Sequence, residues 1–582
     1  MCNFTISENM FLLNGEPFQI ISGAIHYFRI VPEYWRDRLE KLKAMGCNTV
    51  ETYIPWNMHE KKKGVYDFSG MLDVEQFVRT AQGLGLYVIL RPSPYICAEW
   101  EFGGLPAWLL AEEGMHLRVS YGPFLKCVEE YYKELMKRIV PLQICYGGPV
   151  ILMQVENEYG YYANDQAYME KMKKLMLTLG VTVPLVTSDG PYEENLNAGH
   201  LDGVLQTGNF GSKTDERFQT LAKYTDGGPL MCTEFWVGWF DHWGNGGHMT
   251  GNLDESARDF DRMLQLGHVN IYMFEGGTNF GFMNGSNYYE ELTPDVTSYD
   301  YDGVLTEDGQ ITEKYISYQN IIRRYHDIPE VEFHTTINRC EYGTVEVDAM
   351  VSLFAVMDDL CTPVASSYTQ SMEKLGQSYG YILYHSTLDT EESFEKVRLW
   401  GANDRASIFV DEKPVITLYD RELLEEHEVT ADMKRGDDID ILVENMGRVN
   451  FGPLMEQQRK GINQCVQING HMHSNWKHYM LPMEHVDEID FRKAYKERTP
   501  AFYHFTFDVE CIGDTFLDFE GWGKGCIFVN GFNIGRFWMI GPQKRLYIPG
   551  PLLREGRNEI IIFETEGRAA ATITLTDEPN IG

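Results

Sequence analysis

The chain has 582 residues, of which 86 are acidic and 50 basic, so its formal net charge at pH 7 is −36. A surface this acidic repels phosphate groups, which argues against nucleic acids and anionic membranes as partners. The length exceeds what one hydrophobic core usually serves and predicts about three or four domains. Aromatic residues make up 13% of the chain, which suits either large β-sheet cores or rings that stack on a flat, weakly polar ligand.

The first 330 residues alternate strand-like apolar runs with amphipathic segments. Helix-like segments such as 33–45 and 72–84 are followed by a glycine that is typical of a helix end. Eight nearly continuous apolar runs, as expected for strands buried on both faces, begin near Phe18, Asn48, Leu86, Val150, Pro184, Val204, Pro229 and Asn270. This pattern predicts a (β/α)8 (TIM) barrel over residues 1–330. A doubly wound sheet is the alternative, but no GxGxxG motif follows the first run.

After residue 330 the sequence pattern changes to short runs rich in β-branched and aromatic residues, separated by Gly, Asp, Asn and Pro. Such runs are typical of antiparallel sheets, and they occupy residues 381–384, 408–410, 439–443, 505–507, 527–529 and 560–563. A weak internal repeat accompanies them, because IFV at 408–410 recurs at 527–529 and GDDIDILVE at 436–444 aligns with GRNEIIIFE at 556–564. We therefore predict an α/β plus all-β protein, with β-sandwich domains at 331–485 and 486–582.

The chain ends and the cysteines bear on location. The first 18 residues have no basic start, no long apolar run and no small-residue cleavage site. No run of about 18 apolar residues occurs, so no membrane span is expected. The 11 cysteines are scattered without a CxxC or Cys/His ligand spacing. These features predict a cytoplasmic protein with free thiols, no metal site and no cofactor.

Ionisable residues at the carboxyl ends of the predicted barrel strands are the candidate catalytic groups, because active sites of such barrels lie at that end. The second, third, fourth and seventh strands lead into Glu51, Glu99, Glu158 and Glu234, most of them close to Trp or Tyr. No histidine cluster, phosphate-binding loop or G-x-S-x-G motif accompanies them. Paired carboxylates with aromatic rings suit glycoside hydrolysis. The alternative for any single Glu is an exposed or helix-capping residue.

Several longer motifs carry a resemblance. They are CAEWEFGG at 97–104, LPAWL at 105–109, QVENEYG at 154–160, GGTNFG at 276–281, TSYDYD at 297–302 and VNGFNIGRFW at 529–538. Together they resemble the β-galactosidases of glycoside hydrolase family 35, in particular shorter intracellular bacterial members. The resemblance covers essentially the whole chain, and it implies that the two sandwiches have the jelly-roll, galactose-binding-like fold.

The resemblance implies a retaining exo-β-galactosidase that removes terminal β-D-galactose from oligosaccharides by double displacement, with a preference for β-1,3 linkages. Glu158 matches the acid/base and Glu234 the nucleophile. Asn157 would bond the sugar 2-hydroxyl, and Glu156 is expected to support the site rather than contact substrate. The sequence leaves open whether the protein forms a homodimer, and whether the sandwiches bind sugar or only brace the barrel.

The resemblance also implies a sugar pocket. Positions that match residues holding the galactose ring are Tyr53, Cys97, Ala98, Glu99, Asn157 and Tyr301. An apolar platform for the ring is expected from Trp239, with Tyr299 and Trp236 beside it. The leaving-group subsite is predicted to include Trp236, Trp243 and Phe451.

Two further points concern the rim of the predicted pocket. The loop 445–453 either leans over the site or serves only to hold the β-domain to the barrel. Phe282 stands where some relatives carry Tyr, and the lost hydroxyl would change one polar contact.

Three other functions remain open at this stage. The chain could be a different retaining barrel glycosidase, such as a β-glucosidase or an exo-glucosaminidase. It could be a non-catalytic galactose-binding protein, or an inverting hydrolase. The separation of the two carboxyl groups distinguishes retention, at about 5–5.5 Å, from inversion, at about 6.5–9.5 Å.

Overall fold

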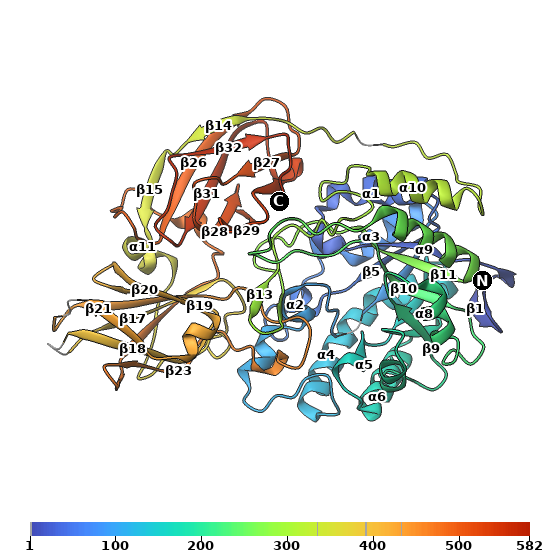
Figure 1. Cartoon of the computed structure of the whole chain (residues 1–582), viewed down its shortest axis with the longest axis horizontal. Helices are drawn as coiled ribbons and strands as arrows, with labels where there is room; N and C mark the ends of the chain where they lie inside the picture. Colours follow the sequence, from blue (N-terminus) through green and yellow to red (C-terminus); the bar gives the residue numbers. More distant parts are fainter. Residues whose placement is uncertain (1–2, 93, 335, 390–392, 432–433) are drawn as a thin grey trace.

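The computed structural model describes residues 3–92, 94–334, 336–389, 393–431 and 434–582. A barrel surrounded by helices occupies the right of Figure 1, and two β-sandwiches lie one above the other on the left. The C-terminal sandwich is the upper one. A long segment across the top connects the last barrel helix to it.

The barrel is closed by eight parallel strands in the order β10-β11-β4-β5-β6-β7-β8-β9. They are β4 (Ile21–Ile25), β5 (Thr49–Tyr53), β6 (Tyr87–Arg91), β7 (Val150–Gln154), β8 (Leu185–Asp189), β9 (Leu205–Asn209), β10 (Met231–Trp236) and β11 (His268–Glu275). Nearly every residue in these strands is buried. All eight predicted strands are therefore confirmed. They could be predicted because a strand that is buried on both faces has a nearly continuous run of apolar residues.

Helices pack around the outside of the barrel (Figure 1). The longer ones are α1 (Pro32–Met45), α3 (Val74–Gly83), α4 (Gly122–Ile139), α6 (Gln166–Thr178), α7 (Glu193–Ala198), α8 (Thr214–Leu221), α9 (Leu253–Leu266) and α10 (Glu313–Ile322). Helix α1 begins at Pro32, whose ring fixes a helical φ, and ends at Met45, after which Gly46 caps it with φ 111°. The Asp73 side chain caps α3 by accepting a hydrogen bond from the Gln76 amide.

A small antiparallel sheet lies at the amino-terminal end of the barrel. It consists of β1 (Phe4–Ser7), β2 (Met10–Leu13) and β3 (Glu16–Pro17). Phe4 and Phe11 join the barrel core, and the Phe11 ring meets His268, the first residue of β11, at 4.7 Å. This end of the barrel is therefore covered, and the opposite, carboxyl-terminal end is left for a site.

The first sandwich packs a six-stranded sheet against a four-stranded one around its own apolar core. The six-stranded sheet is β16 (Val364–Ser366), β25 (Trp476–Leu481), β17 (Tyr381–Thr387), β22 (Asp438–Glu444), β19 (Arg405–Val410) and β20 (Lys413–Tyr419). The four-stranded sheet is β21 (His427–Ala431), β18 (Phe394–Asn403), β23 (Gly461–Ile468) and β24 (His471–His473).

The C-terminal sandwich has the same two-layer design and a separate core. One sheet is β14 (Gly343–Glu346), β32 (Thr572–Thr576), β27 (Thr515–Asp518) and β30 (Arg545–Ile548). The other is β15 (Ala349–Ser352), β26 (Ala501–Val509), β31 (Gly556–Glu564), β28 (Lys524–Val529) and β29 (Phe532–Trp538).

The strand pairing differs from the predicted domain boundary. Strands β14 and β15 fall within the range 331–485 that we assigned to the first sandwich, but they pair with β32 and β26 of the C-terminal sandwich. Helix α11 (Leu353–Leu360) then leads into the first sandwich. The partners of β14 and β15 lie more than 140 residues away in the sequence, so the local pattern of 343–352 does not identify them.

The predicted internal repeat corresponds to equivalent strands. In the first sandwich Tyr381 of β17 pairs with Glu444 of β22, and in the second Ala501 of β26 pairs with Glu564 of β31. Each pair of strands continues into a hairpin, β19–β20 or β28–β29. The repeated sequence therefore marks the same four-strand unit in the same order in both sandwiches.

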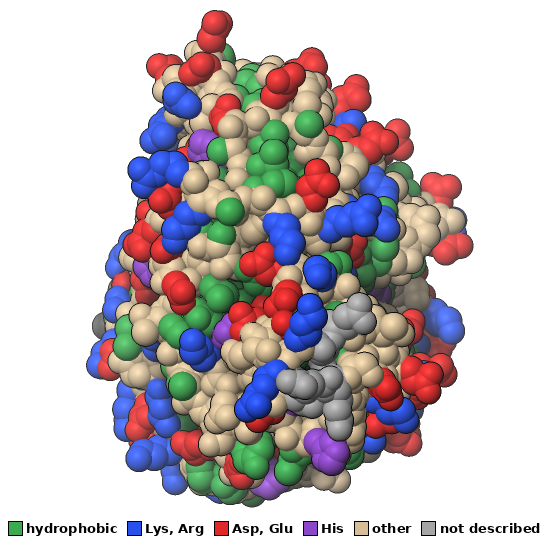
Figure 2. Space-filling view, turned by 90° about the vertical axis from the view of Figure 1, so that its left-hand side faces the viewer, with side chains coloured by type: hydrophobic (Ala, Val, Ile, Leu, Met, Phe, Trp, Pro, Cys, Tyr) green, Lys and Arg blue, Asp and Glu red, His purple; other side chains and the backbone are tan. Residues whose placement is uncertain are grey.

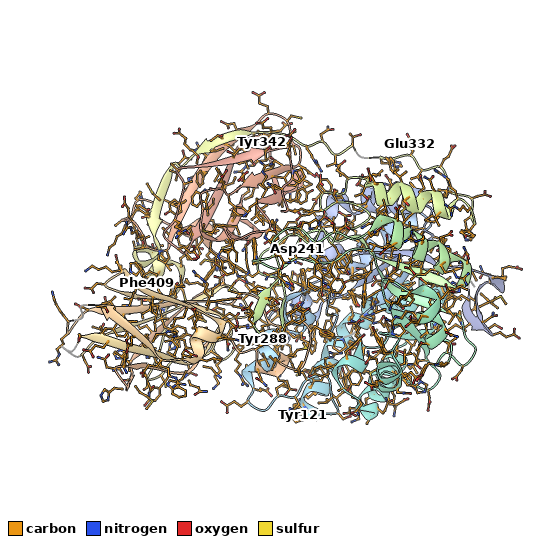
Figure 3. All side chains as sticks on the ribbon, viewed as in Figure 1. Tyr121, Asp241, Tyr288, Glu332, Tyr342 and Phe409 are labelled. Atoms are coloured by element: carbon orange, nitrogen blue, oxygen red, sulfur yellow. The ribbon has the colours of Figure 1, made fainter. Side chains whose placement is uncertain are left out.

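Buried charges join the three domains. Glu444 of the first sandwich accepts hydrogen bonds from Lys524 at 2.5 Å and Arg536 at 3.2 Å, both of the C-terminal sandwich. Arg536 Nε also donates to Oδ1 of Asn284 in the barrel at 2.8 Å. In Figure 3, Asp241 of a barrel loop lies at the centre of the molecule, where the domains meet. The contacts fix the sandwiches against the carboxyl-terminal end of the barrel.

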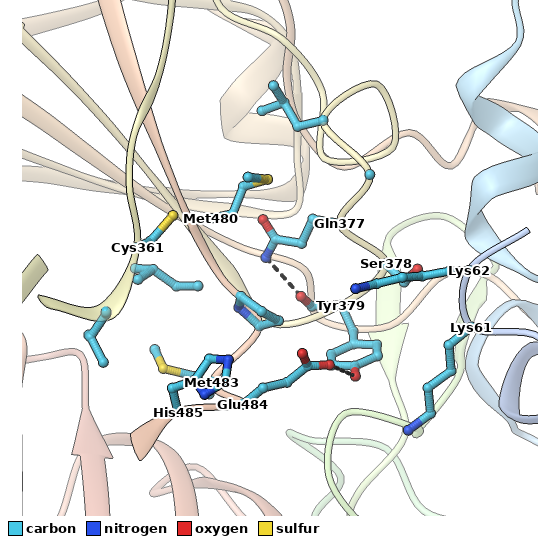
Figure 4. Close-up of a pocket in the computed structure, with 15 residues that line it drawn as sticks. Lys61, Lys62, Cys361, Gln377, Ser378, Tyr379, Met480, Met483, Glu484 and His485 are labelled. Atoms are coloured by element: carbon cyan, nitrogen blue, oxygen red, sulfur yellow. Dashed lines mark hydrogen bonds between the residues drawn. The ribbon is translucent and has the colours of Figure 1, made fainter. Parts of the chain in front are cut away.

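The seam between the barrel and the first sandwich contains an open pocket of about 330 Å³ (Figure 4). Tyr379 donates its hydroxyl to Glu484 at 2.7 Å, and Gln377 donates to the Tyr379 carbonyl at 2.8 Å. None of the predicted site residues lines this pocket.

The outer face of the two sandwiches carries acidic and basic side chains interspersed (Figure 2). In the part of the chain that the structure describes, no helix has the length and apolar character needed to cross a membrane.

Candidate active site

A pocket of about 250 Å³ opens at the carboxyl-terminal end of the barrel, where both predicted catalytic carboxylates meet a ring of aromatic side chains. Its lining comprises Ile96, Cys97, Ala98, Glu99, Glu158, Tyr161, Glu234, Trp236, Trp239, Phe240, Tyr272, Asn287, Tyr289, Tyr301 and Phe451. These residues come from several βα loops and, in the case of Phe451, from the first sandwich.

Glu234 lies near the end of β10 and receives three donors. Arg91 Nη2 and the Tyr53 hydroxyl each lie 2.6 Å from Oε1, and Trp236 Nε1 donates to Oε2 at 3.1 Å. The Arg91 guanidinium also stacks on the Tyr53 ring at 3.9 Å, which fixes both groups. Charge-assisted bonds of this kind stabilise a carboxylate and orient it.

Glu158 has a different environment. Among the residues that the structure describes, its side chain accepts one hydrogen bond, from Asn209 Nδ2 to Oε1 at 3.1 Å. Its backbone adopts φ 47° and its amide donates to the Ser188 carbonyl at 2.9 Å, which turns the side chain off the strand. Burial, and then the negative charge of Glu234, raise the pKa of Glu158 to about 8. At neutral pH this carboxyl group is therefore protonated and can give up a proton.

The two carboxyl groups are thus set for opposite roles by their surroundings. Glu234 accepts hydrogen bonds from one cationic and two neutral donors, whereas Glu158 has one amide donor and a carboxylate neighbour. A pair of titratable groups held in such different environments is the usual sign of an acid and a nucleophile or base.

Glu156 supports the site, as the sequence suggested. Its carboxylate accepts two hydrogen bonds from Arg118, at 3.0 and 2.8 Å, and one from Tyr168 at 2.8 Å. It does not share a strand face with Glu158, because β7 ends at Gln154 and Glu156 adopts φ 58°. Its partner Arg118 lies in the loop before α4.

Three consecutive residues of the left-handed conformation form one wall of the pocket. Cys97, Ala98 and Glu99 have φ values of 58°, 56° and 49°. Arg29 Nη2 donates to the Ala98 carbonyl at 2.5 Å, and the Tyr299 hydroxyl donates to Glu99 Oε2 at 2.5 Å. Burial raises the pKa of Glu99 to about 7. A strained turn that its surroundings hold this firmly points to a functional wall.

The predicted galactose-binding residues divide into two groups. Cys97, Ala98, Glu99, Trp239 and Tyr301 line the pocket. The other three lie behind the lining and act on it through hydrogen bonds: Asn157 Oδ1 accepts from Arg91 at 2.7 Å, Tyr53 contacts Glu234, and Tyr299 contacts Glu99.

The expectation that Tyr299 forms part of the apolar platform is therefore corrected. Its ring is 1% exposed and lies under the Arg29 guanidinium at 3.7 Å. The residue two positions further, Tyr301, reaches the pocket instead. Trp239 is 39% exposed and stacks on Phe240 at 5.0 Å, which leaves part of the indole free for a ligand.

Two residues expected at the site, Trp243 of the leaving-group subsite and Phe282 of the pocket rim, prove to be structural. Trp243 does not line the pocket but packs in the core of the C-terminal sandwich, where it is 7% exposed. Phe282 lies at the domain seam, stacked on Tyr379 at 5.8 Å and covered by Arg536 at 4.7 Å. The chain turns away from the pocket after Phe240, because the following loop crosses to the C-terminal sandwich.

Trp236 and Phe451 do line the pocket. The loop 445–453 also braces the barrel, because Arg448 Nη1 bonds Glu101 Oε1 at 2.5 Å and the Tyr95 hydroxyl donates to the Asn450 carbonyl at 2.6 Å. Both interpretations of this loop therefore hold, since the contacts that anchor it also carry Phe451 to the mouth of the site.

Several site residues were not predicted. Arg91 and Asn209 are the last residues of β6 and β9, so a search of strand ends for hydrogen-bond donors as well as carboxylates would have found them. Tyr161, Asn287 and Tyr289 also line the pocket. The last two lie on or next to the short hairpin β12 (Ser286–Tyr288) and β13 (Leu292–Pro294), for which the sequence gives no signal.

The closed barrel, the paired carboxylates at the ends of its fourth and seventh strands and the aromatic pocket define a barrel glycoside hydrolase. Comparison with known families agrees. The model for "Glycosyl hydrolases family 35" matches residues 10–325. Residues 369–482 match "Beta-galactosidase, first all-beta domain", and residues 500–558 match "Beta-galactosidase, galactose-binding domain".

Relatives align over nearly the whole chain. Beta-galactosidase-1-like protein 2 of Homo sapiens is 40% identical and covers 98% of this chain and 91% of its own length. Beta-galactosidase-1-like protein 3 of Rattus norvegicus is 41% identical, with 95% and 88% covered. Beta-galactosidase of Homo sapiens is 38% identical, with 100% and 91% covered. The chain belongs to glycosyl hydrolase family 35, and it is a glycoside hydrolase of the β-galactosidase type.

Proposed function

We propose that this protein is a retaining exo-β-galactosidase that removes terminal, non-reducing β-D-galactose from oligosaccharides. The observation that carries the proposal is the contrast between the two buried carboxyl groups. Glu234 is held by Arg91, Tyr53 and Trp236, whereas Glu158 has a pKa raised to about 8. Attack by a carboxylate and protonation by a neutral acid are the two requirements of the first step.

In the first step a Glu234 oxygen bonds the anomeric carbon while the bond to the glycosidic oxygen breaks. That oxygen takes the proton of Glu158, and a galactosyl ester remains on Glu234. Esterification removes the negative charge that helps to raise the pKa of Glu158, so this pKa falls and Glu158 becomes a base. It then removes a proton from water, the water oxygen bonds the anomeric carbon, and the ester breaks. Two inversions give net retention.

The pocket supports recognition of a single terminal sugar. The end of the barrel behind it is closed by Tyr53, Asn157 and Arg91, all nearly inaccessible to solvent. Glu99 offers a carboxylate to ring hydroxyls, and the exposed edge of Trp239 offers an apolar surface to the C–H face of the ring. A pocket closed at its inner end supports removal of sugars from chain ends.

We further propose a preference for β-1,3-linked galactose, which rests on the family likeness. A panel of β-1,3, β-1,4 and β-1,6 galactosyl disaccharides tests it, and equal rates on all three would refute it. Faster hydrolysis of nitrophenyl glucoside than of nitrophenyl galactoside would refute the assignment of galactose as the sugar that is removed. Proton NMR of the first product tests retention, because β-galactose must form first and α-galactose would show inversion.

A cytoplasmic location is proposed from the thiols. All ten described cysteines are free, and five of them are buried, which suits a reducing compartment. Fractionation of the source cells with an antibody tests this, and enzyme found outside the cytoplasm would refute it.

A further inference from the structure

A second hollow lies on the same face of the barrel, beside the catalytic pocket. It has a volume of about 560 Å³ and lies between the loops that follow β9 and β10. Its lining includes Trp236 and Trp239, the two indoles that also line the catalytic pocket. We refer to this hollow as the outer groove. The two spaces are therefore neighbours that share one aromatic wall.

The floor of the outer groove is fixed by close backbone packing. A Cβ atom on Gly211 would lie 2.6 Å from the Trp236 carbonyl oxygen, and one on Gly238 would lie 1.8 Å from the Tyr301 carbonyl oxygen. Lys314 Nζ, although buried, donates to the Val237 carbonyl at 2.9 Å. The groove is therefore preformed rather than a gap between mobile loops.

Its far side is held equally well. The amide of Met249 donates to Asp241 Oδ1 at 2.8 Å, and the amide of Gly251 donates to Asp302 Oδ2 at 2.7 Å. His248 also pairs with Asp241 at 2.6 Å. The loop that forms this side is thus anchored to buried groups at the centre of the molecule (Figure 3).

The walls of the outer groove carry unused polar groups of both kinds. Lys213, Glu255 and Arg258 line it, and across the described chain their side chains make no hydrogen bond or ion pair. They place two donors and one acceptor beside the exposed indole of Trp239. These side chains are exposed and available to a ligand, and a sugar offers hydroxyls to them and C–H faces to the indole.

The groove adjoins the catalytic pocket through Trp236, a residue of the predicted leaving-group subsite. Gly211 lines it and follows Asn209 by two residues, and Asn209 Nδ2 is the donor to the Glu158 carboxyl. The proton that frees the leaving group comes from Glu158 in the proposed function. A leaving sugar that extends beyond its first ring therefore meets the groove next.

From these contacts we infer that the outer groove binds the second sugar of the leaving group. The inference rests on the proposed function and specifies its substrate class as galactose-terminated oligosaccharides of three or more sugars. Disaccharides and aryl galactosides fill the catalytic pocket but leave Lys213, Glu255 and Arg258 without partners.

The test compares chain lengths. Values of kcat/KM are measured for nitrophenyl galactoside, for β-1,3-galactosyl-N-acetylglucosamine, and for the trisaccharide that extends this disaccharide at its reducing end. We expect the trisaccharide to be favoured over the disaccharide by about five- to tenfold, as for one or two added hydrogen bonds. Equal values for the two would overturn the inference.

Variants assign the effect to the groove. Glu255→Ala combined with Arg258→Ala removes the trisaccharide advantage and leaves nitrophenyl galactoside within about twofold, the size of a small surface effect. Arg262→Ala is the matched control, because Arg262 lies on the same helix but is paired with Asp215 and does not line the groove. Loss on all substrates in the double variant, or the same loss in the control, would contradict the inference.

A binding measurement separates this inference from the proposed function. If no galactoside is hydrolysed, the proposed function fails. Calorimetric titration of the Glu158→Gln variant with the trisaccharide and the disaccharide still tests the groove without turnover. Tighter binding of the trisaccharide that disappears with Glu255→Ala and Arg258→Ala supports it, and equal affinities refute it.

Discussion

The hydrogen bond from Asn209 to Glu158 gives a sharp prediction about pH dependence. Asn209 Nδ2 donates to Oε1 at 3.1 Å and stabilises the ionised form of Glu158, so it lowers a pKa that burial and Glu234 raise. Asn209→Ala removes the donor without adding charge. The pKa of Glu158 then rises above its present value of about 8. The residue does not line the pocket, so substrate contacts stay in place.

The size of the shift follows from the bond. A hydrogen bond to a charged group is worth about 1.5–3 kcal/mol, and part of it persists with the protonated acid, which leaves a difference of about 1–1.5 kcal/mol. At about 1.36 kcal/mol per pKa unit, the pKa of Glu158 rises by about one unit. The basic limb of kcat/KM reports loss of the proton from this acid, so it moves to higher pH by the same amount.

The assay is hydrolysis of nitrophenyl galactoside between pH 5 and 10. Ser188→Ala is the matched control, because the Ser188 hydroxyl bonds Asn209 Oδ1 at 2.5 Å but does not touch the Glu158 side chain. The control should keep the basic limb near its wild-type position. A basic limb of Asn209→Ala that stays in place or moves to lower pH would refute the assignment of Glu158 as the acid.

Three further predictions concern the site and its support. Glu234→Gln should abolish turnover, whereas Glu158→Gln should lose about 10²–10⁴-fold on natural glycans and much less on nitrophenyl galactoside, which needs little protonation; equal losses on both substrates would contradict this. Trp243→Ala should lower the free energy of unfolding by about 3–5 kcal/mol with KM unchanged, and Trp239→Ala should raise KM with the thermal midpoint unchanged; the reverse pattern would refute their placement. The thermal midpoint should fall from pH 6 to pH 9. Buried carboxyl groups whose pKa is raised in the folded state lose their protons at lower pH in the unfolded state, so their contribution to stability decreases as pH rises. The pKa of His248 is raised to about 10 by Asp241 and Asp300, so the stability that its protonated form adds also decreases over this range, and a constant or rising midpoint would count against those shifts.

The barrel could be predicted from the sequence because each of its strands is buried on both faces and reads as a continuous apolar run. The boundary between the sandwiches could not. No strand was predicted at residues 343–352, and the partners of the two strands found there, β32 and β26, lie far along the chain. Pairing between distant antiparallel strands depends on the folded core, and the local pattern contains no information about it.

The candidate site shows the same division. Barrel topology brings strand ends together, which made Glu158 and Glu234 candidates along with other carboxylates, and the family resemblance implied their roles. Loop residues were harder to place, since Trp239 lines the pocket whereas Trp243, four residues further on, packs in the core of the C-terminal sandwich. Tyr299 and Tyr301 likewise alternate between a buried support and the pocket lining. Spacing places such a residue in a loop but does not give the direction of its side chain.

The central claim is that Glu234 forms a covalent bond to galactose while Glu158 supplies the proton. Incubation with a 2-fluoro-galactosyl fluoride, followed by proteolysis and mass spectrometry, tests it directly. The fluorine at C2 slows both formation and breakdown of the ester, but the fluoride leaving group speeds formation, so the ester accumulates. We predict one galactosyl label per chain, on the peptide that contains Glu234. A label on any other residue would contradict the claim. So would continued turnover without inactivation in which the α-anomer is released first.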